Sequence, residues 1–266
     1  MTDGEIEFGK AHLRYNHPHD LAGIIECYVL NVYNVQKIKR GSVVIDVGSG
    51  IGEFAVLASA RVGREGRVIA IEPSPDDFRA LETNIRENGC SNVIPINAAI
   101  SDREERQSIG FKGRTFGARA DTLHNIIHNL GVSADSIHFV KMDIEGGERR
   151  VIPSSIDLIR NVDYLAIEIH EGYSTELIPF IGELGFRFKR IKRSEYLLQT
   201  IETAIGHPVS VYRLWKAFRS SGESPGLVKT LSGIDISTSD ELVVGLFYKD
   251  LPNSTAPSGN LVGRGM

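Results

Sequence analysis

Residues 43–52 read Val-Val-Ile-Asp-Val-Gly-Ser-Gly-Ile-Gly. Apolar residues surround a single carboxylate, Asp46, and three glycines then follow at alternate positions. From Phe54 onward, apolar residues recur at helical spacing. This pattern predicts a buried strand, a tight turn and the start of a helix. Glycine suits a turn in which the backbone approaches a ligand closely, because a Cβ would collide with that ligand.

Two classes of nucleotide-type cofactor bind to such a turn, and the glycine spacing separates them. A dinucleotide site requires G-x-G-x-x-G, whereas Glu53 occupies that last position here and the third glycine comes one residue early, at Gly52. S-adenosylmethionine (SAM) has no pyrophosphate, and its sites tolerate the observed spacing. Asp46 would repel a pyrophosphate but would help to hold the methionine end of SAM through water. SAM is therefore favoured over a nicotinamide cofactor, and a turn without any ligand remains an alternative.

Composition restricts the classes of function. The 266 residues are 41% hydrophobic and 24% charged, with a formal net charge of -4 and a pI near 6.1. This balance argues against bulk electrostatic binding to nucleic acid. The N-terminus is polar, no long apolar run is present, and the 2 cysteines lack metal-type spacing. These features predict a cytoplasmic protein with reduced thiols. His12, His17 and His19 fit no ligand spacing, and no metal is expected.

The next two predicted strands each end in candidate cofactor contacts. Glu72 ends an apolar strand about 20 to 25 residues beyond the glycine turn and is followed by Pro73, so it is placed to accept both ribose hydroxyls of a nucleoside. The alternative interpretation of Glu72 is an exposed surface acid without a ligand. Asn97 and Ala98 follow the third strand, whose Pro95 marks an edge position. Small residues there would leave room for a purine ring, although a plain strand exit explains them equally well.

Carboxylates also end the fourth and fifth strands. Strand alternation places Lys141, Asp143 and Glu145 on one side of the fourth strand. Asp143 is favoured for function, with Lys141 or the positive sulfonium of SAM as its partner. Glu145 serves equally well as a structural group that binds backbone amides. Glu168 and His170 share one face of the fifth strand, where a catalytic role and a structural role are both open.

Domain organisation follows from composition and spacing. We expect a helical cap segment over residues 1–40, with Asp20 as a helix cap, and one large α/β domain over 41–250. A lid-like insertion at 192–240 and a disordered tail at 251–266 complete the chain. The stretch 211–219 alternates apolar and basic residues with its apolar side chains facing one way, which allows weak contact with a membrane surface but also packing on the sheet. The polar and partly basic residues 101–120 predict a solvated antiparallel excursion or loop.

The chain resembles the FkbM family of SAM-dependent methyltransferases. The resemblance runs from Val43 to His170 and includes, besides the glycine turn, four further blocks. These blocks are Ala70-Ile71-Glu72-Pro73, Thr122-Leu123, Lys141-Met142-Asp143-Ile144-Glu145-Gly146-Gly147-Glu148 and Glu168-Ile169-His170. The aspartate-x-glutamate-glycine block is the specific part, since many methyltransferases share the glycine turn. Ser49 stands where many members carry Ala, and Pro153 and residues 192–240 depart from the usual pattern.

The resemblance implies a Rossmann-like class I α/β fold, and with it a function. In this fold a seven-stranded sheet is mostly parallel with an antiparallel last strand, and helices cover both faces. The expected strand order is 3-2-1-4-5-7-6. The implied reaction is O-methylation of a sugar or secondary metabolite, with a small-molecule or glycan acceptor and no nucleic acid. N-methylation, a nicotinamide-dependent oxidoreductase and a non-catalytic donor-binding module remain alternatives. The expected base is Asp143 or His170, oriented by Glu145 and Glu168. The expected cofactor contacts are Asp46, Gly48, Ser49, Gly50, Gly52, Glu72, Pro73, Asn97, Ala98 and Asp143.

Overall fold

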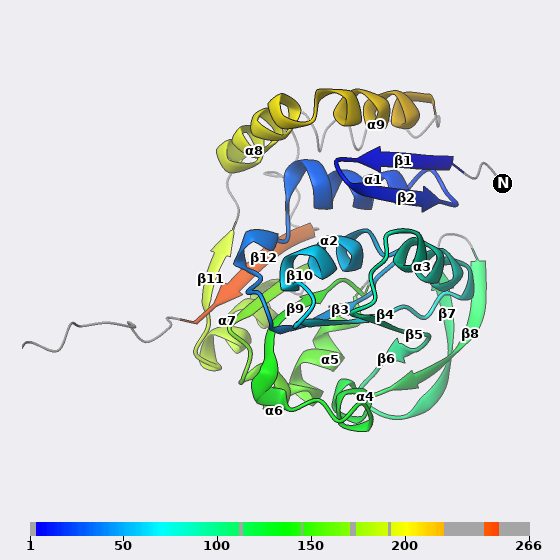
Figure 1. Ribbon diagram of the computed structural model, residues 1–266. Coiled ribbons are helices and arrows are strands. Elements are labelled where there is room, and N and C mark those ends of the chain that lie inside the picture. Colours follow the sequence, from blue (N-terminus) through cyan, green and yellow to red (C-terminus); the bar gives the residue numbers. More distant parts are fainter. Residues whose placement is uncertain are drawn as a thin grey trace, which may run out of the picture.

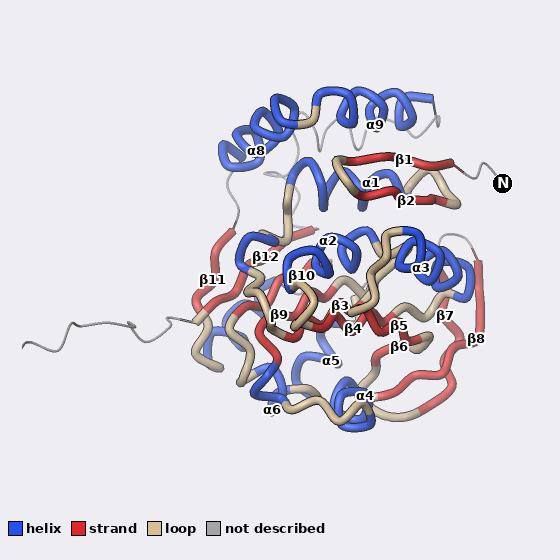
Figure 2. Tube along the Cα trace, in the orientation of Figure 1, coloured by secondary structure: helices blue, strands red, loops and turns tan. Residues whose placement is uncertain are grey.

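A seven-stranded sheet forms the centre of the molecule. The computed structural model describes residues 4–111, 114–144, 146–170, 174–190, 193–220 and 242–249 (Figures 1 and 2). The strand order is β11 (Arg187–Arg190), β12 (Leu242–Tyr248), β10 (Tyr164–His170), β9 (Ile137–Met142), β3 (Val43–Val47), β4 (Arg67–Ile71) and β5 (Val93–Ile96). Only β12 runs antiparallel to its neighbours. The predicted fold class and strand order are confirmed.

Both faces of the central strands are buried, which explains their nearly continuous apolar sequences. Side chains alternate along β3, so Val44 belongs to the core on one face and Ile45 to the core on the other. β5 forms one edge of the sheet, as Pro95 predicted. The sheet thus separates two hydrophobic cores and positions the carboxyl ends of β3, β4, β9 and β10 side by side.

Helices cover both faces of this sheet (Figure 1). On one face lie α2 (Glu53–Val62) and α3 (Pro75–Glu87), and the helices of the opposite core are α4 (Leu123–Asn129), α5 (Glu148–Ser154), α6 (Ile156–Ile159) and α7 (Ser174–Glu183). Ser74 caps α3, because its Oγ accepts a hydrogen bond from Asp77 N, and Pro75 begins the helix. Three-residue 3₁₀ turns occupy Val35–Lys37 and Ala134–Ser136.

The N-terminal segment, expected to be a helical cap, contains strands as well as helices. It begins with a β-hairpin of β1 (Gly4–Phe8) and β2 (Ala11–Tyr15), in which alternate apolar side chains such as Ile6 and Phe8 are buried. The turn passes through Gly9, whose φ of 61° favours glycine. Helix α1 (Asp20–Ile25) and a π-helical turn (Glu26–Leu30) follow. With α8 (Arg193–Gly206) and α9 (Pro208–Ser220), these elements form an outer layer above α2 and α3 in Figure 1.

Two local predictions in this outer layer are wrong. Asp20 is the first residue of α1 and not its cap, because its Oδ2 accepts from the amides of Asn16 and His17 in the preceding turn. In α9, Leu214 is buried, but Tyr212 is 60% and Trp215 46% exposed. The apolar residues of 211–219 therefore face two ways, because the helix packs one stripe inward and leaves a second outward.

A small three-stranded sheet lies beside the β5 edge. Its order is β6 (Ala99–Ile100), β8 (Arg114–Asp121) and β7 (Glu105–Phe111), and β7 pairs antiparallel with β8 as the sequence predicted.

Within the described ranges, no helix combines the length and the apolar character that a membrane crossing requires. The predicted disordered tail at 251–266, and residues 192 and 221–240 of the predicted lid, lie outside the described residues.

Candidate active site

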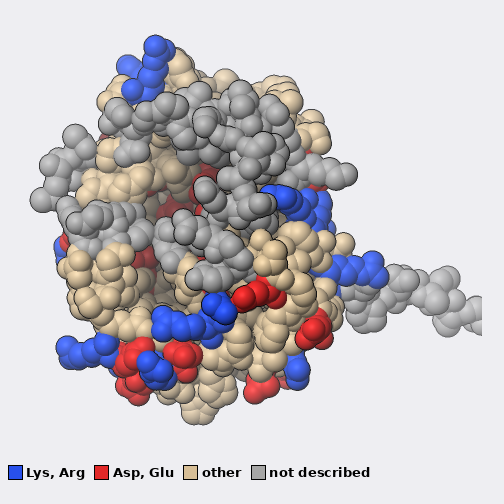
Figure 3. All heavy atoms as spheres, turned by 180° about the vertical axis from the view of Figure 1, so that it is seen from behind, with Lys and Arg blue, Asp and Glu red and all other residues tan. Residues whose placement is uncertain are grey.

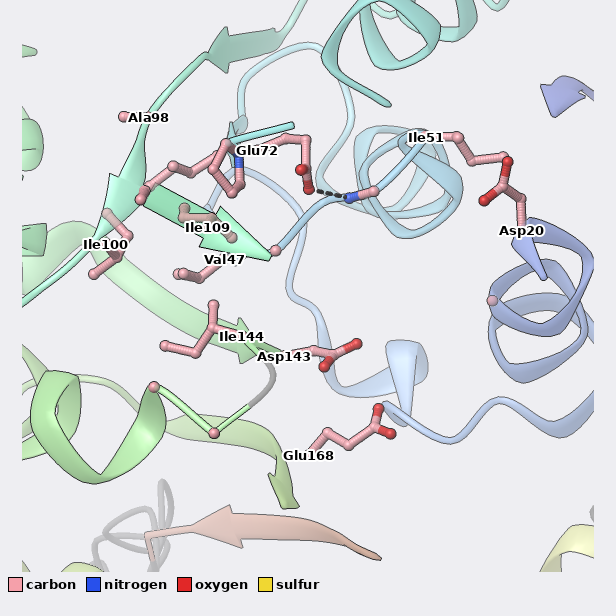
Figure 4. A pocket seen from close by; sticks show the side chains of 18 of the residues that line it. Asp20, Val47, Ile51, Glu72, Ala98, Ile100, Ile109, Asp143, Ile144 and Glu168 are labelled. Carbon is pink, nitrogen blue, oxygen red and sulfur yellow. Dashed lines mark hydrogen bonds between the residues drawn. The ribbon is translucent and has the colours of Figure 1, made fainter. Parts of the chain in front are cut away.

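A cavity of about 900 Å³ opens where the central strands end. Val47 of β3 and Ile71 of β4 form part of its floor, and residues of α1 and of the β7–β8 hairpin form its walls. Acidic side chains are visible inside the hollow in Figure 3. In Figure 4, Val47, Ile100 and Ile109 gather at one end of this pocket, and the carboxylates of Asp143 and Glu168 lie at the other. The carboxyl-end location is the usual ligand position of an open α/β sheet.

The glycine turn approaches both the cavity and the neighbouring strands. Gly48 has a φ of 76°, and a Cβ there would lie 1.8 Å from the carbonyl oxygen of Asp143. Gly50, with a φ of 53°, donates its N–H to Glu72 Oε2 at 2.8 Å, and Ser74 N donates to Glu72 Oε1 at 2.7 Å. These two amides fix the Glu72 carboxylate at the cavity wall (Figure 4). A carboxylate oxygen can accept more than one hydrogen bond, so Glu72 can also accept from a ligand hydroxyl.

Gly52 and Ser49 shape the turn from behind the cavity. A Cβ on Gly52 would lie 2.6 Å from Leu81 Cδ1, so this glycine permits α2 to pack against α3. Its N–H donates to Ser49 O, and Ser49 Oγ donates to Asp46 O at 2.9 Å. The third glycine therefore serves helix packing, with no surface on the cavity.

A buried ion cluster supports the turn. Lys141 Nζ lies 3.4 Å from Asp46 Oδ1 and 4.0 Å from Asp143 Oδ2, and it donates to Gly48 O at 2.5 Å. Burial raises the pKa of Asp46, and Lys141 partly offsets this effect. Burial alone would lower the pKa of Lys141, but Asp46 and Asp143 raise it above its ordinary value. Lys141 therefore stays protonated and links the turn to Asp143.

The apolar end of the cavity combines Ala98 with Ile100, Ile109 and Ile144 (Figure 4). Ile109 comes from β7, so part of the hairpin that was predicted to be solvated instead forms cavity wall. Asn97 is not a lining residue, because its amide donates to the backbone carbonyls of Glu72 and Pro73 at 2.8 and 3.3 Å. This end offers apolar surface to a flat base, with Glu72 at its side.

The acidic end brings together residues from distant parts of the chain. Tyr33 OH donates to Glu168 Oε2 at 3.2 Å, and the Glu168 side chain is buried. Glu26, from the π-helical turn, also lines the cavity, and burial followed by the nearby Glu168 and Asp143 raises its pKa well above the ordinary value. Sequence reasoning missed Glu26 and Tyr33, because both lie in the predicted cap and match no motif.

Glu53 is a third residue that sequence reasoning missed. It is the first residue of α2, and its Oε2 is buried with no hydrogen-bond partner in the described part of the chain. Burial raises the pKa of Glu53 to about 8. A Cβ on Gly23 would lie 2.5 Å from Glu53 Oε1, so a glycine in α1 allows that helix to approach the carboxylate. The only signal in the sequence was its position directly after the glycine turn.

The cavity thus gathers most of the predicted site residues. Gly48, Gly50, Glu72, Pro73, Ala98, Asp143 and Glu168 line it, whereas Asp46, Ser49, Gly52 and Asn97 lie behind its wall. Glu145 and the side chain of His170 lie outside the described residues. Asp46 is fully buried and does not line the cavity, so its expected contact with SAM through water stays a prediction. In the described ranges, no three His, Cys, Asp or Glu side chains converge to hold a metal ion.

These groups fit SAM. The apolar end suits adenine, and the Glu72 carboxylate suits the ribose hydroxyls. The buried, unpaired Glu53 Oε2 and the acidic end suit the positive ammonium and sulfonium groups. The volume of about 900 Å³ falls in the upper range of ligand pockets and leaves space for a second molecule.

Comparisons with known proteins identify the family of this chain. The model of the methyltransferase FkbM domain matches residues 46–188, which confirms the resemblance seen in the sequence. The hexuronic acid methyltransferase AglP of Haloferax volcanii is 27% identical over 176 residues, covering 60% of this chain and 71% of that protein. A protein-L-isoaspartate O-methyltransferase of Caenorhabditis elegans is 28% identical over 127 residues, covering 47% of this chain and 52% of that protein. A SAM-dependent methyltransferase structure from Aquifex aeolicus has a TM-score of 0.42 and 17% identity, covering 66% of this chain and 92% of that one.

Proposed function

Because the chain belongs to the FkbM methyltransferase family and is a SAM-dependent methyltransferase, we propose that it methylates a hydroxyl oxygen of a sugar or sugar-bearing metabolite. One observation carries this proposal: a single cavity joins the glycine turn and Glu72 to the carboxylates of Asp143 and Glu168. A donor and an acceptor bound there share one space. The name of the Haloferax volcanii relative, a hexuronic acid methyltransferase, supports a sugar acceptor.

The donor-side residues hold and align the cofactor. SAM, when bound, supplies an electrophilic methyl group. Glu72 accepts hydrogen bonds from the ribose hydroxyls, and Glu53 faces the ammonium group. Gly48 and Gly50 let the backbone approach the methionine part, and Lys141 with Asp46 holds the turn from behind. Fixing the methyl group against the acceptor oxygen supplies much of the rate enhancement in such a displacement.

The acceptor-side residues handle the proton. Asp143 would accept the hydroxyl proton of the acceptor, and SAM held by Glu72 and Glu53 would supply the methyl group to the acceptor oxygen. Glu168, held by Tyr33 OH, orients the acceptor through a hydrogen bond. His170, two residues beyond Glu168 on β10, is the alternative base. Residues of α1 and the π-helical turn close this end against water.

A labelled-methyl transfer assay tests the proposal. The purified chain is incubated with SAM that carries a labelled methyl group and with neutral hexosides, hexuronosides and amino sugars, and products are analysed by mass spectrometry and NMR. We expect a methyl ether on a ring or side-chain oxygen, formed by the parent chain and lost with Asp143→Asn. Label found only on nitrogen would replace O-methylation with N-methylation. SAM binding without transfer to any hydroxyl acceptor would contradict the proposal.

A further inference from the structure

The outer face of α8 and α9 carries an unusual concentration of exposed apolar side chains. Within the described ranges, every large hydrophobic side chain that is strongly exposed lies on these two helices, with exposures from 46% to 77%. They are Leu197, Leu198, Ile201, Ile205, Val209, Tyr212 and Trp215. Apolar patches of this extent on a folded domain mark interaction sites.

These side chains form a second apolar stripe, separate from the one that anchors the helices. Tyr196, Leu214 and Phe218 are buried against the rest of the molecule, and Thr203 Oγ1 donates to Val29 O. The exposed residues recur at spacings of three and four on the opposite side of both helices. A helix that is apolar on two sides is typical of an element buried between two bodies.

The two halves of this face differ in chemistry. The α8 half is aliphatic and contains the exposed acid Glu202, whereas the α9 half is aromatic and contains the bases Lys216 and Arg219, the latter with its guanidinium over the Trp215 ring. Glu202 and Lys216 each lie seven positions from Val209, on opposite sides of it. Neither has an ion-pair partner among the described residues. If a second copy is related to the first by a half rotation about an axis near Val209, its α9 half faces the α8 half of the first copy. The basic half of each copy then meets the acidic half of the other.

We propose that this face is the interface of a two-fold homodimer, in which α8 of one chain packs against α9 of its partner. A two-fold axis brings the same patch of both chains together and places Glu202 of each chain opposite Lys216 of the other. The seven apolar side chains expose roughly 800 Å² per chain, the area that each partner contributes to a standard-size interface. The acid within the aliphatic half opposes insertion of this face into a lipid bilayer.

Sedimentation equilibrium and light scattering of the full chain test the association. The parent chain should be a dimer at micromolar concentration. Ile205→Glu places a charge on the most exposed apolar position, so it should give a monomer with an unchanged circular dichroism spectrum. The control Glu183→Lys alters an exposed charge on α7 and should remain a dimer. A parent chain that is monomeric throughout the micromolar range overturns the proposal, and binding of that monomer to anionic vesicles would assign the face to a membrane.

Charge reversal tests the two-fold geometry. Glu202→Lys and Lys216→Glu should each weaken the homodimer about tenfold, because each creates two like-charge contacts across the axis. A mixture of the two variants should regain the parent affinity, since both contacts in the mixed dimer are then attractive. The combined variant Glu202→Lys/Lys216→Glu should regain it as well. Single variants that dimerise like the parent, or a mixture that shows no recovery, would overturn this arrangement.

Discussion

The two ends of the cavity are built in different ways. The donor end depends on the glycine turn at residues 48–52 and on Glu72. These directly follow the adjacent strands β3 and β4, and the Gly50 amide bonds to the Glu72 carboxylate. The acidic end combines Glu26, Asp143 and Glu168, which come from three elements far apart in the chain. A local turn determines the first end, whereas only the assembled fold creates the second. Substitutions should therefore separate cofactor binding at one end from turnover at the other.

The largest effect is expected for Asp143→Asn. The amide cannot accept the hydroxyl proton, so kcat should fall by about a hundredfold or more, the usual contribution of a general base. The SAM dissociation constant, measured by calorimetry, should change much less. Asp135→Asn makes the same chemical change on an exposed 3₁₀ turn and should leave both quantities unaltered.

His170→Ala tests the alternative base with the same assay. If Asp143→Asn turns over at the parent rate and His170→Ala does not, the base is His170. If both variants turn over at the parent rate, neither side chain is the base and only alignment remains as the source of catalysis.

Glu72→Ala should have the next largest effect, now at the donor end. It removes the acceptor for the ribose hydroxyls and for the amides of Gly50 and Ser74, so SAM binding should weaken by more than about tenfold. Calorimetry measures this loss, and Glu82→Ala on the exposed side of α3 provides the control. An unchanged affinity would remove the ribose assignment.

The sequence predicted the donor end better than the acidic end for a physical reason. Strand alternation and glycine spacing act over a few residues, so they placed Gly48, Gly50, Glu72 and Asp143 correctly at the cavity. They also predicted that Gly52 contacts the cofactor, whereas in the structure Gly52 packs against Leu81. A pattern reveals that a position requires glycine but not which neighbour imposes the requirement.

The residues that the sequence missed depend on tertiary contacts. Glu26 and Tyr33 reach the cavity only because the outer layer folds over α2, a contact that no local period encodes. The segment before α1 contains a hairpin for a similar reason, since Ile6 and Phe8 are buried only when that layer is assembled. The sequence did not predict the outward stripe of α9, because the buried residues Leu214 and Phe218 and the exposed residues Tyr212 and Trp215 are interleaved along one helix.

Glu53 should make SAM binding depend on pH. Its pKa of about 8 means that it is mostly protonated at pH 7 before SAM binds. The positive groups of SAM favour its ionised form, so binding should release protons near pH 7 and tighten by up to about tenfold as pH rises from about 6 to 7, a range in which the ammonium group of SAM stays protonated. Glu53→Gln should flatten this dependence, and calorimetry in buffers of different ionisation enthalpy measures the protons released. A variant that keeps the parent pH profile would show that Glu53 does not face the ammonium group.

The smallest effect is expected for Tyr33→Phe, which tests the orientation of Glu168 at the acidic end. The variant removes the hydroxyl that donates to Glu168 Oε2 but keeps the ring, which packs edge-on against Phe54. Loss of one hydrogen bond should lower kcat/KM for the acceptor by about fivefold and leave the SAM dissociation constant unchanged. Tyr28→Phe is the matched control, because its buried hydroxyl has no hydrogen-bond partner among the described residues. An equal loss in both variants would assign the effect to packing of the outer layer, and Glu168 would then need no orientation by Tyr33.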